Sequence, residues 1–282
     1  MLVIFRLVVS DIDGTLLDEQ GMLRRQTRRT VQKVQKAGIL FALATSRRWT
    51  GAEPVAHALG FPMPLIIYDG IQIRSFPSGE VMYEESLNSV VAGQAVLALA
   101  SRHLTPILQY SDSQVERLVV GILPDESPHP SSHTARYLST FKNQVQELPL
   151  DELAHPFADP LRLATFGPYD QLAAVTEELA RLECGWQILP QGSYGTAELT
   201  VFAPGVSKGA ATLELCRQVG ISKEEVFTIG DGPNDLTLLR AGGLGVAMGN
   251  ASAEVKAVAR AIAPSNQENG LAVAIEQFVL SS

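Results

Sequence analysis

Val9-Ser10-Asp11-Ile12-Asp13-Gly14-Thr15-Leu16 is the stretch that decides the fold. It completes a largely apolar run over residues 2–9, which predicts a buried strand, and the glycine after the second aspartate indicates a turn. Asp11 and Asp13 therefore end a strand of an open α/β sheet, at the edge where such sheets bind their ligands. One carboxylate there can act as a nucleophile and the other as a general acid or base.

Three more polar motifs lie where the pattern predicts the end of a strand or the start of a helix. Gly230–Asp235 follows a second strand-like run far along the chain, Thr45-Ser46-Arg47 ends another, and Lys208 opens a helix. A single Asp-Ile-Asp-Gly-Thr is also typical of an Asx turn that closes a strand. Turn chemistry does not predict four such motifs, so we interpret them together as one site.

The composition predicts a globular protein with one large domain or two modest ones. The chain has 282 residues, of which 46% are hydrophobic. Cys184 and Cys216 are expected to be small buried side chains, because two cysteines make a disulfide framework improbable. The apolar N-terminus has no basic leader and no cleavage site, and no apolar run approaches the roughly 18 residues of a membrane span. We therefore expect a cytoplasmic protein without a membrane partner.

The net charge of −8 is unevenly distributed along the chain. Residues 85–203 contain 6 Lys/Arg and 14 Asp/Glu, so they carry the whole imbalance, and the remainder is neutral. A nucleic-acid partner would require a basic surface, and this distribution disfavours one. The basic residues between 24 and 36 have helical spacing and no interleaved aromatic side chains, which is typical of a solvated helix surface.

The order of predicted elements indicates an α/β fold with a Rossmann-like parallel sheet. Strands are expected at 3–10, 39–44, 64–68, 226–230, 244–248 and 261–263, with a hairpin at 71–76 and 81–84. Helices are expected at 26–37, 53–59, 208–219, 235–241, 252–260 and 270–279. Alternation of strand and helix favours a parallel sheet covered on both faces.

The middle of the chain has a different pattern. Two amphipathic helices, 88–101 and 171–182, accompany strands at 107–110, 118–123, 161–166, 186–189 and 198–202. Several of these strands alternate apolar and polar residues, as in an antiparallel sheet covered on one face. We therefore expect an α+β domain at residues 85–203, inserted between the two core segments 1–84 and 204–282.

The carboxylates of the site point to a metal ion and a phosphorylated ligand. Unneutralised, Asp11, Asp13, Asp231 and Asp235 would repel one another and raise each other's pKa values. A hard cation held by carboxylates, water and phosphate, as Mg²⁺ usually is, resolves this repulsion. A lysine, a threonine hydroxyl and the N–H groups of a turn are the remaining groups that bind a phosphoryl group.

The motifs Ser10–Leu17, Pro204–Gly209, Gly230–Asp235 and Val246–Ala251 resemble those of the haloacid dehalogenase-like (HAD) hydrolase superfamily, and in particular its Cof-type, or class IIB, phosphatases. The resemblance covers nearly the whole chain in motif order. It implies hydrolysis of a small phosphorylated metabolite, such as a sugar phosphate, a phosphorylated cofactor or a nucleotide. It also implies that residues 85–203 form a cap that selects the leaving group.

The resemblance further implies the roles of three aspartates. Asp11 would attack phosphorus and form an aspartyl-phosphate, and Asp13 would protonate the leaving oxygen and then activate water. The side chains of Asp11 and Asp231 and the backbone carbonyl of Asp13 would bind Mg²⁺. An acidic residue at position 13 favours a phosphatase or a phosphomutase over the ATPases of the superfamily.

The other site residues follow from the same resemblance. Thr45 and Lys208 would bind the phosphate, with Lys208 also counted among the catalytic residues. Asn234 would contact the phosphate or a metal-bound water, and Asp235 would support the metal shell or Lys208. A phosphomutase, or a non-catalytic protein that binds a phosphorylated ligand, is the alternative.

Two positions depart from the usual motifs of the superfamily. Ser46 stands in place of a glycine, where it offers an N–H and a hydroxyl to phosphate, and it would be strained if the position required positive φ. Asp69 stands in place of an asparagine before Gly70 and adds a carboxylate near the site.

Four residues of the insert and one tryptophan of the core are less informative. Pro130 between His129 and His133 predicts a loop there rather than a helical metal site. Tyr194 and Glu198, near the return to the core, are candidates to face the substrate. Trp49, directly after Arg47 and Arg48, is expected to pack at a helix start, with stacking on the substrate as the alternative.

Overall fold

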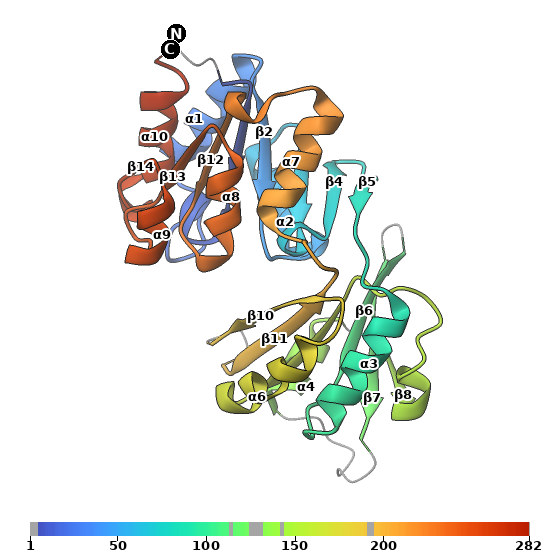
Figure 1. The fold of residues 1–282 in the computed structure, drawn as a ribbon. Helices are drawn as coiled ribbons and strands as arrows, with labels where there is room; N and C mark the ends of the chain where they lie inside the picture. The colour runs from blue at the N-terminus through green and yellow to red at the C-terminus, as the bar shows by residue number, and fades with distance from the viewer. Residues whose placement is uncertain (1–4, 113–114, 124–131, 142–143, 191–194, 282) are drawn as a thin grey trace. The chain divides into compact units, whose positions relative to one another are not determined.

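The computed structural model describes residues 5–112, 115–123, 132–141, 144–190 and 195–281. The chain divides into two compact units. Unit 1 comprises Met1–Glu84 and Val206–Ser282, and unit 2 comprises Glu85–Gly205. Figure 1 shows an α/β arrangement in unit 1 and a second sheet with its own helices in unit 2. The predicted fold class, an α/β protein with a parallel core sheet and an α+β insert, is confirmed.

Unit 1 is built on an eight-stranded sheet in the order β14-β13-β12-β1-β2-β3-β4-β5. All neighbours from β14 to β3 are parallel, and β4 and β5 extend the sheet as an antiparallel hairpin. The strands are β1 Leu7–Ser10, β2 Leu40–Ala44, β3 Met63–Ile67, β4 Gln72–Phe76, β5 Val81–Glu84, β12 Val226–Gly230, β13 Leu244–Ala247 and β14 Ala261–Ile262. Most are continuous apolar runs, as expected for strands buried on both faces.

Helices cover both faces of this sheet. Helices α7, α8 and α9 lie on one face, where Leu215 and Leu238 join a buried cluster with Leu7, Val9 and Ile66. Helices α1, α2 and α10 lie on the other face. The bounds are α1 Arg25–Lys36, α2 Trp49–Leu59, α7 Lys208–Val219, α8 Leu236–Ala241, α9 Ala253–Val258 and α10 Gly270–Phe278.

The strand order places a natural ligand site at the end of β1. From β1 the chain proceeds to β2 on one side, while β12 pairs with β1 on the other side. The loops that leave β1 and β12 at their carboxyl ends therefore run toward opposite sides of the sheet, and open α/β sheets bind their ligands at such a point. Asp11 and Asp231 directly follow these two strands.

Unit 2 contains a six-stranded sheet in the order β10-β11-β9-β6-β7-β8, in which only the pair β7–β8 is parallel. Its strands are β6 Ile107–Asp112, β7 Val115–Ile122, β8 Val145–Pro149, β9 Arg162–Gly167, β10 Gly185–Leu189 and β11 Ala197–Phe202. Its helices are α3 Ser89–Ala100, α4 Ser132–Ser139, α5 Leu150–Leu153 and α6 Tyr169–Leu179.

Some expectations for unit 2 were wrong. His133 lies in α4, not in a loop, and α4 packs on the sheet face opposite α3 and α6, so both faces carry helices. Helix α3 is not amphipathic, because its exposed side also carries Val90 and Leu97. His129 and Tyr194 lie outside the described residues. No helix in the described ranges is both long enough and apolar enough to cross a membrane.

Candidate active site

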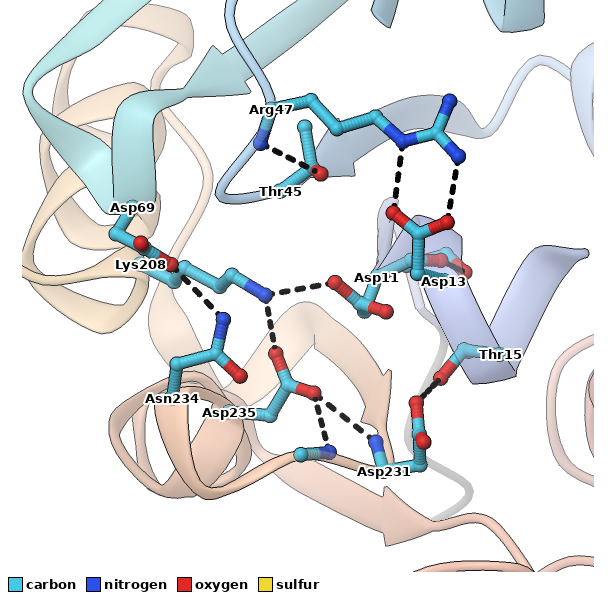
Figure 2. Close-up of polar contacts among 12 residues, drawn as sticks. Asp11, Asp13, Thr15, Thr45, Arg47, Asp69, Lys208, Asp231, Asn234 and Asp235 are labelled. Carbon is cyan, nitrogen blue, oxygen red and sulfur yellow. Dashed lines mark hydrogen bonds and ion pairs between the residues drawn. The ribbon is translucent and has the colours of Figure 1, made fainter. Parts of the chain in front are cut away.

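Polar side chains gather at the carboxyl ends of adjacent strands of unit 1. Asp11 follows β1, Thr45 follows β2, Asp69 lies just after β3, and Asp231 follows β12. Lys208 is the first residue of α7, whose N-terminus is capped by Ser207, because the Ser207 hydroxyl accepts the Ala210 N–H at 3.1 Å. Figure 2 shows the side chains of this region together, among them Asp11, Lys208 and Asp231.

A buried lysine joins two of the carboxylates. Lys208 Nζ donates to Asp11 Oδ1 at 2.6 Å and to Asp235 Oδ1 at 2.7 Å. Its side chain is only 1% exposed, and those of Asp11 and Asp235 are 7% and 1% exposed. Removing the lysine would leave both carboxylates buried without compensation, which is costly. The pairing therefore fixes where Asp11 and Asp235 lie.

Asp231 is held by side chains from two other loops. Thr15 Oγ1 donates to Asp231 Oδ1 at 2.7 Å, and Asn250 Nδ2 donates to its Oδ2 at 3.1 Å. Gly14, at φ +81°, allows this approach, because a Cβ there would lie 2.2 Å from Asp231 Oδ2. Only glycine adopts that conformation readily and leaves that space.

Asp235 forms two of its hydrogen bonds with the backbone of its own loop. Its Oδ2 accepts the N–H groups of Asp231 and Gly232 at 3.0 and 2.9 Å, while its Oδ1 accepts the lysine ammonium. Both oxygens are thus engaged by protein donors. This geometry fits support of the Asp231 loop and of Lys208.

The electrostatics of the site favour a bound cation. Burial and the nearby Asp235 raise the pKa of Asp11 well above its usual range, although Lys208 acts in the opposite direction. Burial raises the pKa of Asp231 to about 6, and the Thr15 hydrogen bond offsets part of that rise. Both groups disfavour ionisation without a counter-charge.

The donor set suits a hard divalent ion. Asp11, Asp231 and Asp235 each place a carboxylate oxygen such that all three lie within 4.8 Å of one another. These are oxygen ligands only, the type that Mg²⁺ prefers. Asp235 accepts three hydrogen bonds from protein donors, whereas Asp231 accepts two and Asp11 one, so Asp11 and Asp231 retain more lone pairs for the ion.

The carboxylate of Asp13 turns toward the loop after β2. Arg47 Nε and Nη2 contact its two oxygens at 2.7 and 2.5 Å, and Arg47 Nη1 donates to Gly51 O at 3.0 Å. The Asp13 side chain is 56% exposed, unlike the buried Asp11. It is therefore accessible to a ligand from solvent.

The loop that carries Arg47 also contains Thr45 and Ser46. Thr45 is buried, and its Oγ1 accepts the Arg47 N–H at 3.1 Å. Among the described residues, positive φ outside glycine occurs at Tyr68, Asp69, His103 and Asn269. Ser46 is thus not strained. Trp49 is buried at the start of α2, as expected.

Asp69 and Asn234 meet on the side of the site nearest α7. Asn234 Nδ2 donates to Asp69 Oδ1 at 2.9 Å. The backbone N–H of Asp69 donates to Thr45 O at 3.0 Å, which ties the loop after β3 to the loop after β2. The predicted site residues therefore occupy neighbouring loops, and their chemical roles stay predictions.

The structure adds three residues that the motif analysis did not assign to the site. Thr15 and Asn250 hold Asp231, and Arg47 holds Asp13. Each stands within a motif already recognised as polar, or immediately after a strand. A hydroxyl or an amide in the loop beyond a strand end could have indicated Thr15 and Asn250, since such groups lie at the same edge of the sheet as the aspartates.

A cluster of buried carboxylates that share one lysine, at the carboxyl ends of neighbouring parallel strands, is typical of an enzyme active site. A sequence model of the haloacid dehalogenase-like hydrolase family matches residues 8–275. The chain therefore belongs to the haloacid dehalogenase-like hydrolases, which confirms the predicted family and the prediction of a hydrolase.

Similar proteins include named phosphatases. The pyridoxal phosphate phosphatase YbhA of Escherichia coli strain K12 is 27% identical over 98% of both chains. The 5-amino-6-(5-phospho-D-ribitylamino)uracil phosphatase YcsE of Bacillus subtilis strain 168 is 25% identical, covering 98% of this chain and 96% of its own. A haloacid dehalogenase-like hydrolase from Bacteroides thetaiotaomicron has a similar solved structure, with a TM-score of 0.76, 29% identity, and coverage of 97% of this chain and 99% of its own.

Proposed function

We propose that this chain is a Mg²⁺-dependent phosphatase that hydrolyses a small phosphorylated metabolite through an aspartyl-phosphate at Asp11. The observation that carries this proposal is the buried Lys208 ammonium between Asp11 and Asp235, with Asp231 beside them. A nucleophile, a cation for phosphoryl oxygens and a set of metal ligands are the groups that such a reaction requires.

The metal is the proposed cofactor. The side chains of Asp11 and Asp231 and the backbone carbonyl of Asp13 would hold it, and Asp235 would support Lys208 and the Asp231 loop. When bound, Mg²⁺ supplies a Lewis acid that neutralises charge on the phosphoryl oxygens. Thr45, Ser46, Lys208 and Asn234 are the proposed phosphate-binding residues.

The reaction proceeds in two steps through this chain's own residues. The Asp11 carboxylate attacks phosphorus as the bond to the leaving oxygen breaks, and Asp13 gives that oxygen its proton. Asp13 then accepts a proton from the water that attacks the aspartyl-phosphate, so the phosphorus–oxygen bond to Asp11 breaks and inorganic phosphate forms. The 56% exposure of the Asp13 side chain suits contact with an alcohol and with water in turn.

The proposed substrate is a compact phosphomonoester. The named relatives act on pyridoxal phosphate and on a phosphoribityl compound, which supports this class. We further propose that residues 85–203, between core segments 1–84 and 204–282, form the cap that selects the leaving group. The two unpaired cysteines, Cys184 and Cys216, are consistent with the proposed cytoplasmic location.

A phosphate-release assay over a panel of phosphorylated metabolites tests this function. We expect release from compact monophosphates with Mg²⁺, loss of activity after exhaustive chelation, and recovery when Mg²⁺ is returned. Full activity in chelator would refute the metal assignment. Product analysis with a sugar phosphate separates hydrolysis from a phosphomutase, which would return an isomeric sugar phosphate in place of inorganic phosphate.

A further inference from the structure

Asp69 lies where three loops of the site meet. It has φ +55°, and its N–H donates to Thr45 O at 3.0 Å. At the next residue, Gly70, a Cβ would lie 2.3 Å from Ser207 O, so the loop after β3 presses directly against the start of α7. These contacts fix the backbone of Asp69 and therefore limit where its carboxylate can reach.

The carboxylate of Asp69 determines which end of the Asn234 amide faces it. Asn234 Nδ2 lies 2.9 Å from Asp69 Oδ1. An ionised carboxylate only accepts hydrogen bonds, so the amide must turn its nitrogen toward Asp69. The Asn234 oxygen then lies on the other side, where a Cβ on Gly232 would be 2.6 Å from it. An amide at position 69 would permit both orientations.

The same carboxylate acts on the lysine of the site. Burial alone would lower the pKa of Lys208, but the charges of Asp11, Asp235 and Asp69 raise it well above its usual range. The Asp69 carboxylate accepts the Asn234 N–H at 2.9 Å, and Figure 2 shows it beside the stem of Lys208. One carboxylate thus orients an amide and favours a charged ammonium.

We infer that Asp69 is a positioning residue that fixes the Asn234 amide, so that one Asn234 N–H is bound and the other is left, together with Lys208, for a phosphoryl oxygen. This inference rests on the proposed function, because it assumes that phosphate binds between these donors. It goes beyond that function by assigning a role to a side chain that touches neither the leaving group nor the attacking water.

A double-mutant cycle on phosphate affinity tests the inference. Binding of inorganic phosphate in the presence of Mg²⁺ is measured by calorimetry for the full-length wild type, Asp69→Asn, Asn234→Ala and the double variant. If Asp69 acts through the amide, Asp69→Asn should weaken binding about fivefold when Asn234 is present and clearly less in the Asn234→Ala background, where only the charge of Asp69 still acts, on Lys208. Equal effects in both backgrounds would overturn the inference.

A swap of the two side chains separates positioning from simple structural support. Asn234→Asp should lower the Tm, because it places two carboxylates in contact. The double variant Asp69→Asn/Asn234→Asp should restore the Tm, because the amide at position 69 now donates to the carboxylate at position 234. Phosphate affinity should stay low in the swapped protein, because position 234 no longer offers an N–H. Recovery of both Tm and affinity would contradict positioning. Glu254→Gln, an exposed charge loss on α9, is the control.

Failure of this inference is distinct from failure of the proposed function. A wild type that binds phosphate but hydrolyses nothing in the panel would refute the proposed function, and the double-mutant cycle on phosphate affinity could still be interpreted. Hydrolysis with additive effects at positions 69 and 234 would sink only the inference. A wild type that neither binds phosphate nor hydrolyses any substrate of the panel would overturn both.

Discussion

Arg47 spans the Asp13 carboxylate, with Nε 2.7 Å from one oxygen and Nη2 2.5 Å from the other. The third nitrogen of the guanidinium donates to Gly51 O in the first turn of α2. Arg47 therefore connects a candidate acid/base group to the start of a helix. Arg47, from the loop after β2, thus orients the Asp13 side chain, which transfers the proton in the proposed reaction.

Arg47→Lys should lower kcat while the fold is retained. A lysine is a single point donor, so it cannot hold two carboxylate oxygens and a carbonyl at once. Loss of one charge-assisted hydrogen bond predicts a decrease of about tenfold. Steady-state kinetics on the best substrate measure it, with Arg25→Lys on the exposed face of α1 as the control. An unchanged kcat would show that Asp13 does not depend on this contact.

Asp11→Asn should abolish turnover and leave the protein folded, because an amide of nearly the same shape is a poor nucleophile. Asp13→Asn should impair both steps, by about 10²–10⁴ in rate, the usual contribution of general acid–base catalysis. Covalent incorporation of phosphate should occur at Asp11 when Mg²⁺ is present. Peptide mapping locates the label, and a label on another residue would refute the assignment of the nucleophile.

Lys208→Met should destabilise the protein by about 3–5 kcal/mol, the usual consequence of removing one partner from a buried ion pair. Asp11 and Asp235 would remain buried without their ammonium. Urea unfolding in chelator measures the change, and Lys223→Met removes an exposed lysine as the matched control. A loss below about 1 kcal/mol would mean that the two carboxylates find other compensation.

The stability of the metal-free protein should fall as the pH rises through the range in which Asp231 ionises. Burial raises the pKa of Asp231 from 3.8 to about 6, so the folded protein holds this proton more tightly than the unfolded chain does. The associated stabilisation is present below about pH 4 and is lost by about pH 6. Asp11 is shifted in the same direction.

Comparison with Asp231→Asn isolates this contribution. In chelator, the Tm of the wild type minus that of Asp231→Asn should decrease between pH 4.5 and 6.5. Addition of Mg²⁺ should reverse the trend, because the ion stabilises the carboxylate form. A difference in Tm that is constant across this range would show that Asp231 does not titrate differently in the folded state. Asp170→Asn, on α6, is the control for general charge effects.

The charge of residues 85–203 should penalise substrates that bear several phosphates. This segment carries −8, and long-range repulsion is strongest at low salt. Of its basic side chains, Arg102 pairs with Glu178 at 2.7 Å and Arg162 donates to Gln109 at 2.9 Å, so both are already engaged. Measurements of kcat/KM for matched mono- and polyphosphates at two ionic strengths test this. A polyphosphate preferred at low salt would contradict it.

Elements with strong local signals were predicted most accurately. Helix α7 begins at Lys208 and ends at Val219 as predicted, because Ser207 caps its start and Gly220 adopts the left-handed conformation after its end. Strand β12 was equally clear, as an unbroken buried run. Residues 132–153 contain α4, β8 and α5, which were missed, because each is short and mixes polar with apolar residues.

The candidate site was predictable at the level of loops but not of side-chain pairs. The carboxylates that follow β1 and β12 could be placed at the same edge of the sheet, since the carboxyl ends of parallel strands lie side by side. The contacts of Arg47 with Asp13 and of Asp69 with Asn234 depend on loop conformations that residue type alone does not determine. Thr15, although part of the opening motif, has a partner far along the chain, which a local pattern does not reveal.

The central position of β1 has a consequence for biosynthesis. Lys208 follows Asp11 by 197 residues, so at 5–20 residues per second roughly 10 to 40 s of translation separate them. Strand β12, at Val226–Gly230, emerges later still, so β1 is without its neighbour on that side throughout the synthesis of unit 2. A nascent chain thus exposes one edge of its central strand until β12 emerges. Slow or stalled translation beyond residue 205 should therefore favour aggregation before any catalytic activity exists.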